Sequence, residues 1–325
     1  MLVRMATVLA LSVGAPALPA AAADYPDHAI RMIVPFAAGG GTDVLARIIA
    51  QNLNSRWGQP VIVENEPGAS GAIGTRAAMK AAPDGYTLLM ASTGALMAVS
   101  AGADDGGPFD VNRYLTPIAI GAAPPYLLVV SPTLPVQTTA ELIRYAKQKP
   151  DGLTFGSSGI GAASHLSGLL FASDTGIKML HIPYKGTGPA VTDLLGGRID
   201  MMFAPGPVVD QFVQSGQLKA LGVTDIRRSK FYPDVPTVAD AVPGYESVGW
   251  FGLLGPPHLP PGIVKRINAA IVSAMQTREF RDHLATLGAE PELQTPEEFG
   301  RYINADVAKW SRLVKDNDVQ LPGGK

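Results

Sequence analysis

A glycine-rich turn between an apolar run and a helical pattern is the stretch of this sequence best suited to chemistry. The apolar run Ile30–Val34 predicts a buried strand, and three glycines follow it before Thr42 and Asp43. From Val44 on, apolar residues recur at the spacing of one helix face. A strand, a glycine turn and a helix start expose N–H groups without helical partners, and such groups bind anions. The stretch therefore predicts a site for a small anion such as a carboxylate, with an ordinary tight turn as the alternative.

Motifs for nucleotides, metals and covalent catalysis are missing. The turn has no P-loop lysine and no Gly-x-Gly-x-x-Gly, so we expect no nucleotide and no cofactor. The chain has no cysteine, and its five histidines are scattered without metal-ligand spacing. No serine lies in Gly-x-Ser-x-Gly. Ser158 and Ser164 lie near His165 and could suggest a Ser–His pair, but at a helix start we expect them to cap the helix or donate to a ligand.

Length and charge limit the class of protein. With 325 residues, 46% of them hydrophobic and 17% charged, the chain is expected to form two globular lobes. Its net charge of −2 gives no electrostatic footprint for nucleic acid or for an anionic membrane. We therefore expect a small-molecule ligand.

The first residues have the composition of a secretory signal peptide. Arg4 precedes a short apolar core and a small-residue run that ends at Ala23. The core is too short to span a bilayer, and without cysteine there is no lipid attachment site. We therefore expect residues 1–23 to be removed, leaving a chain that starts at Asp24, is not inserted in the membrane and resides in the periplasm.

The elements that must position the glycine turn alternate between strand and helix, which predicts parallel sheets and an α/β fold. Ligands of such sheets bind at the carboxyl ends of the strands, so the first turn and Ser92-Thr93-Gly94 should share one edge. A second strand, glycine–serine turn and helix start fall at residues 153–171. Crossings between lobes are expected at residues 124–125 and 225–236. This predicts lobe I from residues 24–123 and 225–325, and lobe II from residues 124–224.

Several motifs in order resemble one known family. They run from about Tyr25 to about Val314 and include Ile33-Val-Pro-Phe-Ala-Ala-Gly-Gly-Gly-Thr-Asp43, Ala82-Pro-Asp-Gly-Tyr86, Gly156-Ser-Ser-Gly159, Pro183-Tyr-Lys-Gly186, Asp193-Leu-Leu-Gly-Gly197, Pro233-Asp-Val-Pro-Thr237 and Trp250-Phe-Gly252. This set is similar to the Bug family, the periplasmic solute-binding receptors of tripartite tricarboxylate transporters.

The resemblance implies a two-lobed, type II periplasmic binding protein of the Venus-flytrap kind, each lobe a mainly parallel sheet flanked by helices. It implies capture of a small carboxylate, delivery to membrane permease subunits, and no enzymatic activity; we expect a monomer. In the family two loops hold a carboxylate through backbone amides and waters. The matching ligand-binding residues here are Phe36, Ala37, Ala38, Gly39, Gly40, Gly41, Thr42 and Asp43 in the first loop, Ser157, Ser158, Gly159, Ser164 and His165 in the second, and Ser92, Thr93, Tyr184, Gly186 and Thr187 in other pocket-lining segments.

One departure from the family bears on the ligand. Many members carry Asp-Asn after the Met-Met-Phe strand, where this chain has Ala204-Pro205. The resemblance makes Ala204 a further ligand-binding residue, so a polar group of the pocket is lost at this position. The loss disfavours an amino-acid ligand, because an ammonium group favours an acidic partner, and we expect a ligand without an ammonium group. Two other functions stay open: a receptor that feeds a signalling sensor, and an exported hydrolase.

Overall fold

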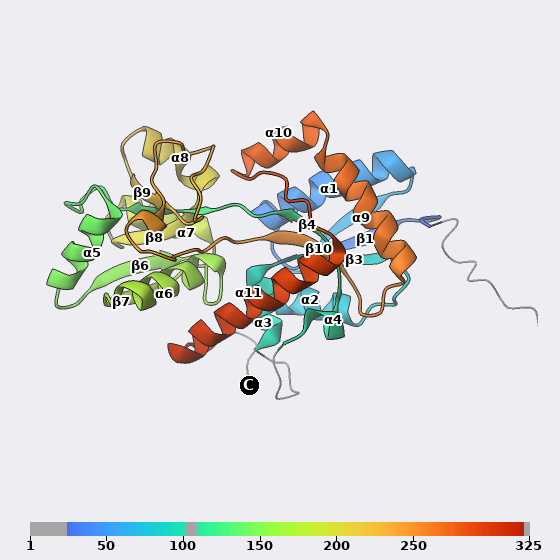
Figure 1. Ribbon diagram of the computed structural model, residues 1–325, viewed down its shortest axis with the longest axis horizontal. Helices are drawn as coiled ribbons and strands as arrows, with labels where there is room; N and C mark the ends of the chain where they lie inside the picture. The colour runs from blue at the N-terminus through green and yellow to red at the C-terminus, as the bar shows by residue number, and fades with distance from the viewer. Residues whose placement is uncertain (1–24, 102–108, 322–325) are drawn as a thin grey trace, which may run out of the picture.

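The computed structural model describes residues 25–101 and 109–321, and residues 1–23, predicted to be a signal peptide, lie outside them. Figure 1 shows two lobes side by side, each built on one five-stranded sheet with helices on both faces. The prediction of a two-lobed α/β fold is therefore confirmed. No helix among the described residues is both long enough and apolar enough to cross a membrane.

The first sheet has the strand order β2-β1-β3-β10-β4. Its strands β1 and β2 are parallel, as are β1 and β3, while β10 runs antiparallel to both of its neighbours. The strands are β1 (Ile30–Val34), β2 (Val61–Asn65), β3 (Thr87–Ser92), β4 (Thr116–Ala122) and β10 (Phe251–Gly255). The helices of this part are α1 (Gly41–Trp57), α2 (Ala72–Met79), α3 (Thr93–Ser100), α4 (Val111–Tyr114), α9 (Pro261–Met275), α10 (Arg278–Thr286) and α11 (Pro296–Asp316), with a 3-10 turn at Ala69–Gly71.

The second sheet repeats this plan with the order β7-β6-β8-β5-β9, in which β5 is the antiparallel strand. Its strands are β5 (Tyr126–Val130), β6 (Leu153–Ser157), β7 (Met179–Pro183), β8 (Met201–Pro205) and β9 (Lys219–Val223). Its helices are α5 (Thr139–Gln148), α6 (Ala163–Thr175), α7 (Thr187–Leu195) and α8 (Gly206–Gln214), with a 3-10 turn at Val238–Asp240. The prediction that both sheets are mainly parallel is confirmed.

The two connections between the lobes lie against each other, because Pro125 and Val248 form an antiparallel bridge. Beyond β9 the chain stays with the second sheet: Val238, Val242 and Tyr245 are buried in its core. The predicted boundary at residue 225 assigns these residues to lobe I, whereas their side chains pack in the core of lobe II. The boundaries stay a prediction, and we propose to move the second one to Val248.

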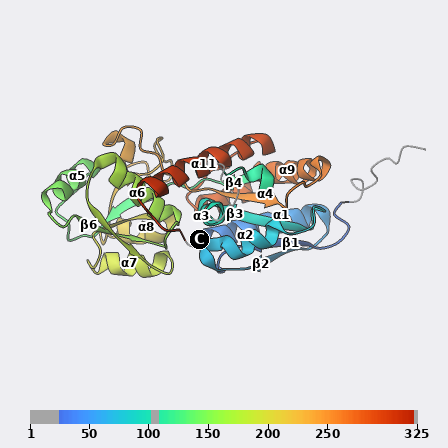
Figure 2. The same cartoon turned by 90° about the horizontal axis from the view of Figure 1, so that it is seen from below.

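The last helix, α11, connects the lobes a third time by packing. Its apolar face, including Phe299, Ile303 and Trp310, is buried with the first sheet, and its contacts extend to α6 of the second lobe. Lys309 on this helix donates to the carbonyl of Glu246 at 2.5 Å. Figures 1 and 2 both show α11 crossing from one lobe to the other.

Candidate functional site

A cleft of about 750 Å³ lies between the lobes, in the size range of small-molecule sites. It lies where β1, β3, β8 and β10 meet the loops and helix starts next to them. From lobe I it is lined by Phe36, Ala37, Ala38, Gly39, Gly40, Gly41, Thr42, Val44, Ser70, Ser92, Thr93, Gly94, Trp250, Phe251 and Leu287, and from lobe II and the connections by Pro124, Pro125, Tyr126, Ser158, Gly159, Ile160, Ala162, Ala163, Gly186, Thr187, Gly188, Pro205, Pro207, Val208 and Gly249. None of these described lining residues carries a charged side chain.

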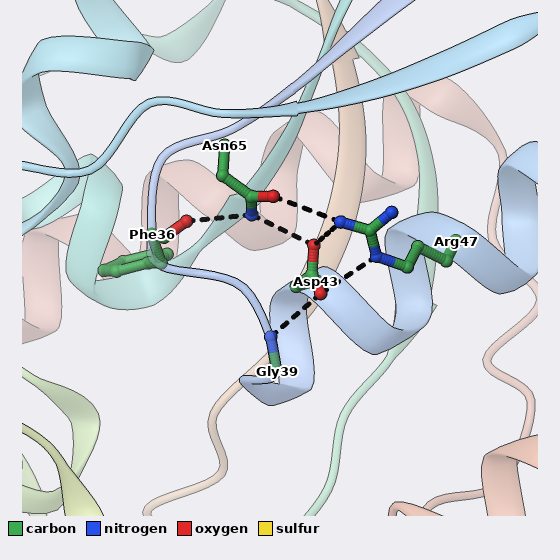
Figure 3. A network of polar contacts seen from close by, with 5 residues as sticks. All are labelled: Phe36, Gly39, Asp43, Arg47 and Asn65. Atoms are coloured by element: carbon green, nitrogen blue, oxygen red, sulfur yellow. Dashed lines mark hydrogen bonds and ion pairs between the residues drawn. The ribbon is translucent and has the colours of Figure 1, made fainter.

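The first loop is braced from behind by Asp43, the third residue of α1. Its carboxylate accepts from the N–H of Gly39 at 2.9 Å, from Arg47 at 2.9 and 3.0 Å, and from Asn65 at 3.0 Å. Asn65 also donates to the carbonyl of Phe36 at 3.0 Å. Figure 3 shows this network, which joins both ends of the loop to β2 and to the first turns of α1. Gly39 has a φ of +88°, a left-handed conformation in which glycine carries no steric cost.

Asp43 does not line the cleft, because its side chain is only 4% exposed and faces Arg47. Burial alone would raise the pKa of the carboxyl, but the hydrogen bonds from Arg47, Gly39 and Asn65 outweigh it and hold the pKa below its usual range. The charge of Asp43 is thus matched by Arg47 inside the protein. The loop presents backbone to the cleft, and the N–H groups of Gly40, Gly41 and Thr42 have no acceptor among the described residues.

The end of β3 forms the wall beside this loop. Ser92 ends β3 at the N-cap position of α3 without a side-chain capping hydrogen bond, and Thr93 is the first residue of α3, so residues 92–94 form a helix start. The Thr93 hydroxyl donates to Asp306 of α11 at 3.3 Å. The same carboxylate accepts from the indole N–H groups of Trp250 at 2.8 Å and Trp310 at 2.6 Å. Asp306 therefore fixes two lining residues without lining the cleft itself.

The second loop satisfies most of its own N–H groups, which differs from the expectation. Ser158 N–H donates to Ser164 Oγ at 3.0 Å and Gly161 N–H to His165 Nδ1 at 3.1 Å. Gly159 N–H donates to Ser157 Oγ at 3.1 Å. The side chains predicted to contact a ligand at Ser157, Ser164 and His165 are buried and shape the loop. Only Ser158 and Gly159 of the predicted second-loop residues line the cleft.

Two stacked histidines, His165 and His181, hydrogen-bond to residues of this loop. The rings of His165 and His181 lie 3.9 Å apart, and His181 Nε2 is 2.6 Å from Ser157 Oγ. Burial lowers the pKa of His165 to about 3, with the neighbouring His181 adding to the shift, and burial lowers the pKa of His181 to about 4. Both rings are therefore neutral near pH 7, and His165 Nδ1 can accept its hydrogen bond.

We expect the free energy of unfolding to decrease as the pH falls from about 6.5 to about 4. In that window the unfolded chain protonates both histidines, whereas the folded protein keeps them neutral, so acid favours unfolding. The slope from each histidine is at most about 1.4 kcal/mol per pH unit. Urea titrations between pH 7.5 and 4.5 measure it.

The control variants separate these histidines from other acid effects. His181→Gln should flatten the pH dependence, while His258→Asn, at an exposed position whose positive φ asparagine tolerates, should not. If His181→Gln and the parent protein lose stability in parallel with acid, His181 does not titrate as described.

The remaining predicted residues divide into two groups. Gly186 and Thr187, at the start of α7, line the cleft. Tyr184 does not, because its hydroxyl donates to Asp193 at 2.8 Å. Ala204 is fully buried in the core of the second sheet, and the next residue, Pro205, reaches the cleft instead. Ala204 itself therefore offers no surface to a ligand, and whether any predicted residue binds one stays a prediction.

The sequence missed lining residues of two kinds. Trp250 and Phe251 stand in an apolar run of the sequence, which predicts core; in the structure Trp250 precedes β10 and Phe251 begins it. Ser70 and Tyr126 stand in no motif, and only the folded chain brings them together. Ser70 Oγ lies 3.4 Å from the carbonyl of Ile160 and so bridges the lobes at the rim.

The described residues of the site form no serine–histidine arrangement suited to hydrolysis. The one close Ser–His pair in the described chain, buried Ser157 and partly buried His181, lies outside the cleft, and Ser157 also donates to the carbonyl of Gly159. Ser158 and Ser164 hydrogen-bond each other at 3.0 Å, without contact to a base. A nucleophile requires a base within reach of the reacting group, and this cleft offers uncharged donors instead.

Two sheet-based lobes around an uncharged cleft, with free N–H groups at a helix start, define a solute-binding protein. The chain belongs to the tripartite tricarboxylate transporter receptor family, whose sequence profile matches residues 45–319. This is a family of transport receptors, so the chain is a binding protein rather than an enzyme.

Three similar proteins illustrate the relationship. Protein BugT of Bordetella pertussis is 37% identical over 306 residues, which cover 94% of each chain. The structure of the periplasmic binding protein BugD has a TM-score of 0.77 and 34% identity, covering 91% of this chain and 99% of BugD. An R. palustris protein solved with adipate has a TM-score of 0.78 and 34% identity, covering 90% of this chain and 98% of that one.

Proposed function

We propose that this protein captures a small carboxylate in the cleft and delivers it to the membrane permease subunits of a tripartite tricarboxylate-type transporter. The observation that carries the proposal is the first loop, where three consecutive N–H groups have no acceptor in the part of the chain that the structure describes and face a cleft without charged lining residues. A helix start carries about half a positive charge, so it attracts a carboxylate without a cationic side chain. The similar R. palustris protein solved with adipate supports this ligand class.

The proposal includes the cell compartment and the oligomeric state. Residues 1–23 act as a signal peptide, and the mature protein works as a monomer in the periplasm. Membership of a receptor family for transport supports delivery to a permease over coupling to a signalling sensor.

A thermal-shift screen of the refolded mature protein tests capture. Refolding removes any co-purified ligand, and the panel contains aliphatic dicarboxylates, tricarboxylates, aromatic carboxylates and acidic amino acids. A ligand present at 100 times its Kd should stabilise the folded state by about 2.7 kcal/mol. No shift across the panel would contradict carboxylate capture.

Two further measurements separate the alternative functions. Ligand that is recovered chemically unchanged after incubation excludes the hydrolase. Loss of uptake of the radiolabelled ligand in cells that lack this protein supports transport, whereas normal uptake with a lost transcriptional response would indicate the sensor.

A further inference from the structure

Tyr126 occupies a distinctive place at the connection between the lobes. It follows Pro124 and Pro125 and is the first residue of β5, where its N–H donates to Thr224 Oγ1 at 2.8 Å. Its neighbour across the sheet is Pro205, another lining residue. The Tyr126 carbonyl also accepts from the N–H of Thr224 at 2.9 Å, so the backbone of the tyrosine is fixed where the residue lines the cleft.

The hydroxyl of Tyr126 has no hydrogen-bond partner among the described residues. Other tyrosines of this chain donate to protein oxygens, such as Tyr184 to Asp193 and Tyr245 to the carbonyl of Ser167. Burial raises the pKa of Tyr126 to about 12, so the phenol stays a neutral donor at every physiological pH. A donor inside a cleft that no protein group satisfies is available to a bound molecule.

The surroundings of this hydroxyl form a polar spot in lobe II. A Cβ placed on Gly249 would lie 3.2 Å from Tyr126 Cε2, 3.9 Å from its oxygen and 3.6 Å from Ala163 Cβ. The phenol ring and Ala163, the first residue of α6, thus lie on either side of the space that a side chain at position 249 would fill, and glycine leaves this space open. The N–H groups of Ala163 and Ser164 in the first turn of α6 have no acceptor among the described residues.

Two sets of donors that have no acceptor among the described residues therefore lie in opposite lobes of the cleft, in addition to the hydroxyls of lining serines and threonines such as Ser158 and Thr187. One is the first loop of lobe I, at Gly40 and Thr42, and the other is Tyr126 with the start of α6. Pro124, Trp250 and Phe251 give the same cleft an apolar wall. A ligand that satisfies both places has two oxygen-bearing ends and an apolar middle.

We propose that Tyr126 is a specificity-determining residue whose hydroxyl donates to the second oxygen-bearing end of the ligand, so that the cleft prefers a diacid to the monoacid of equal chain length. This inference rests on the proposed function. It adds Tyr126 as a ligand-contacting residue and a preference for diacids over monoacids. A hydrogen bond to a charged oxygen in such a site corresponds to roughly tenfold to hundredfold in affinity.

The experiment compares matched acids on matched variants. Calorimetry measures the binding of succinate against butyrate, glutarate against pentanoate and adipate against hexanoate. The parent protein should prefer its best diacid to the paired monoacid by at least about tenfold. Tyr126→Phe should weaken that diacid by about tenfold and change the monoacid by less than about twofold. Tyr302→Phe, the same change on α11 outside the cleft, should alter neither.

Each outcome decides the matter. Equal weakening of diacid and monoacid in Tyr126→Phe, or no weakening of either, overturns the role of the hydroxyl. A parent protein that binds monoacids as tightly as diacids overturns the inference while the proposed function stands. If the parent protein binds no acid of the series or of the wider carboxylate panel, the proposed function fails and the inference fails with it.

Discussion

Replacing Gly40 by valine is expected to abolish carboxylate binding while the protein stays folded. Gly40 has a φ of −81°, which every residue can adopt, and a Cβ built on it meets only the carbonyl oxygen of Ala37, at 3.9 Å. The fold therefore has room for a side chain. The space that valine fills is the space beside the free N–H groups, so a carboxylate could no longer approach the backbone.

Calorimetry with the best ligand of the panel should show affinity falling at least about a hundredfold, because both backbone contacts and close approach are lost. The midpoint of thermal unfolding without ligand should move by only a few degrees. Gly40→Ala should give an intermediate loss, and Gly196→Val, outside the cleft and with a φ of −76°, should bind normally. Undiminished affinity in Gly40→Val would show that the first loop does not hold the anion.

Asp43→Ala is expected to weaken binding by about tenfold and to lower the free energy of unfolding by about 1–2 kcal/mol. The variant removes the acceptor of the Gly39 N–H and of the Asn65 side chain, so the hydrogen bonds that fix the conformation of the first loop are lost. Arg47 is 53% exposed and can turn to water, which limits the loss of stability. Removing a negative charge would by itself favour an anion, so a weaker affinity measures the geometric effect.

The variant Asp43→Asn separates geometry from charge. Asparagine keeps an oxygen for Gly39 and leaves Arg47 in place, so its affinity should fall by less than about threefold. Equal losses in Asp43→Ala and Asp43→Asn would mean that the carboxylate charge is what matters. Because the folded-state pKa of Asp43 is lowered, its contribution to stability is complete above pH about 4 and is lost as the pH falls through the folded value. The stability gap between parent and Asp43→Ala should close accordingly.

The parts of the molecule that local sequence determines could be predicted. The strand, glycine turn and helix of the first loop are consecutive in the chain, and residues 36–42 all line the cleft. The second loop has the same local pattern, but its N–H groups are taken up by Ser157, Ser164 and His165, with His181 contributed from β7. The motif predicts the loop and the helix after it, but it does not show which N–H groups of the loop are already satisfied by side chains.

The residues that tertiary structure alone brings together could not be predicted. Tyr126 is the first residue of β5 and Trp250 directly precedes β10, and both line the cleft because these two strands begin beside it. Ala204 shows the opposite case. Its position near the end of β8 predicted that it lines the pocket, but its side chain packs in the core of the second sheet. Alternation along a strand is resolved only when the neighbouring strands and helices are in place.

The position of β10 also constrains the order of folding. This strand lies between β3 and β4, where Phe251 pairs with Ser92 on one side and Ala122 on the other. Until residues 251–255 have been synthesised, β3 and β4 lack the neighbour that joins them and expose unpaired, apolar edges. Such a long-range insertion slows folding and leaves incomplete chains prone to aggregation. The first sheet of this chain can therefore be completed only after residues 251–255 are available.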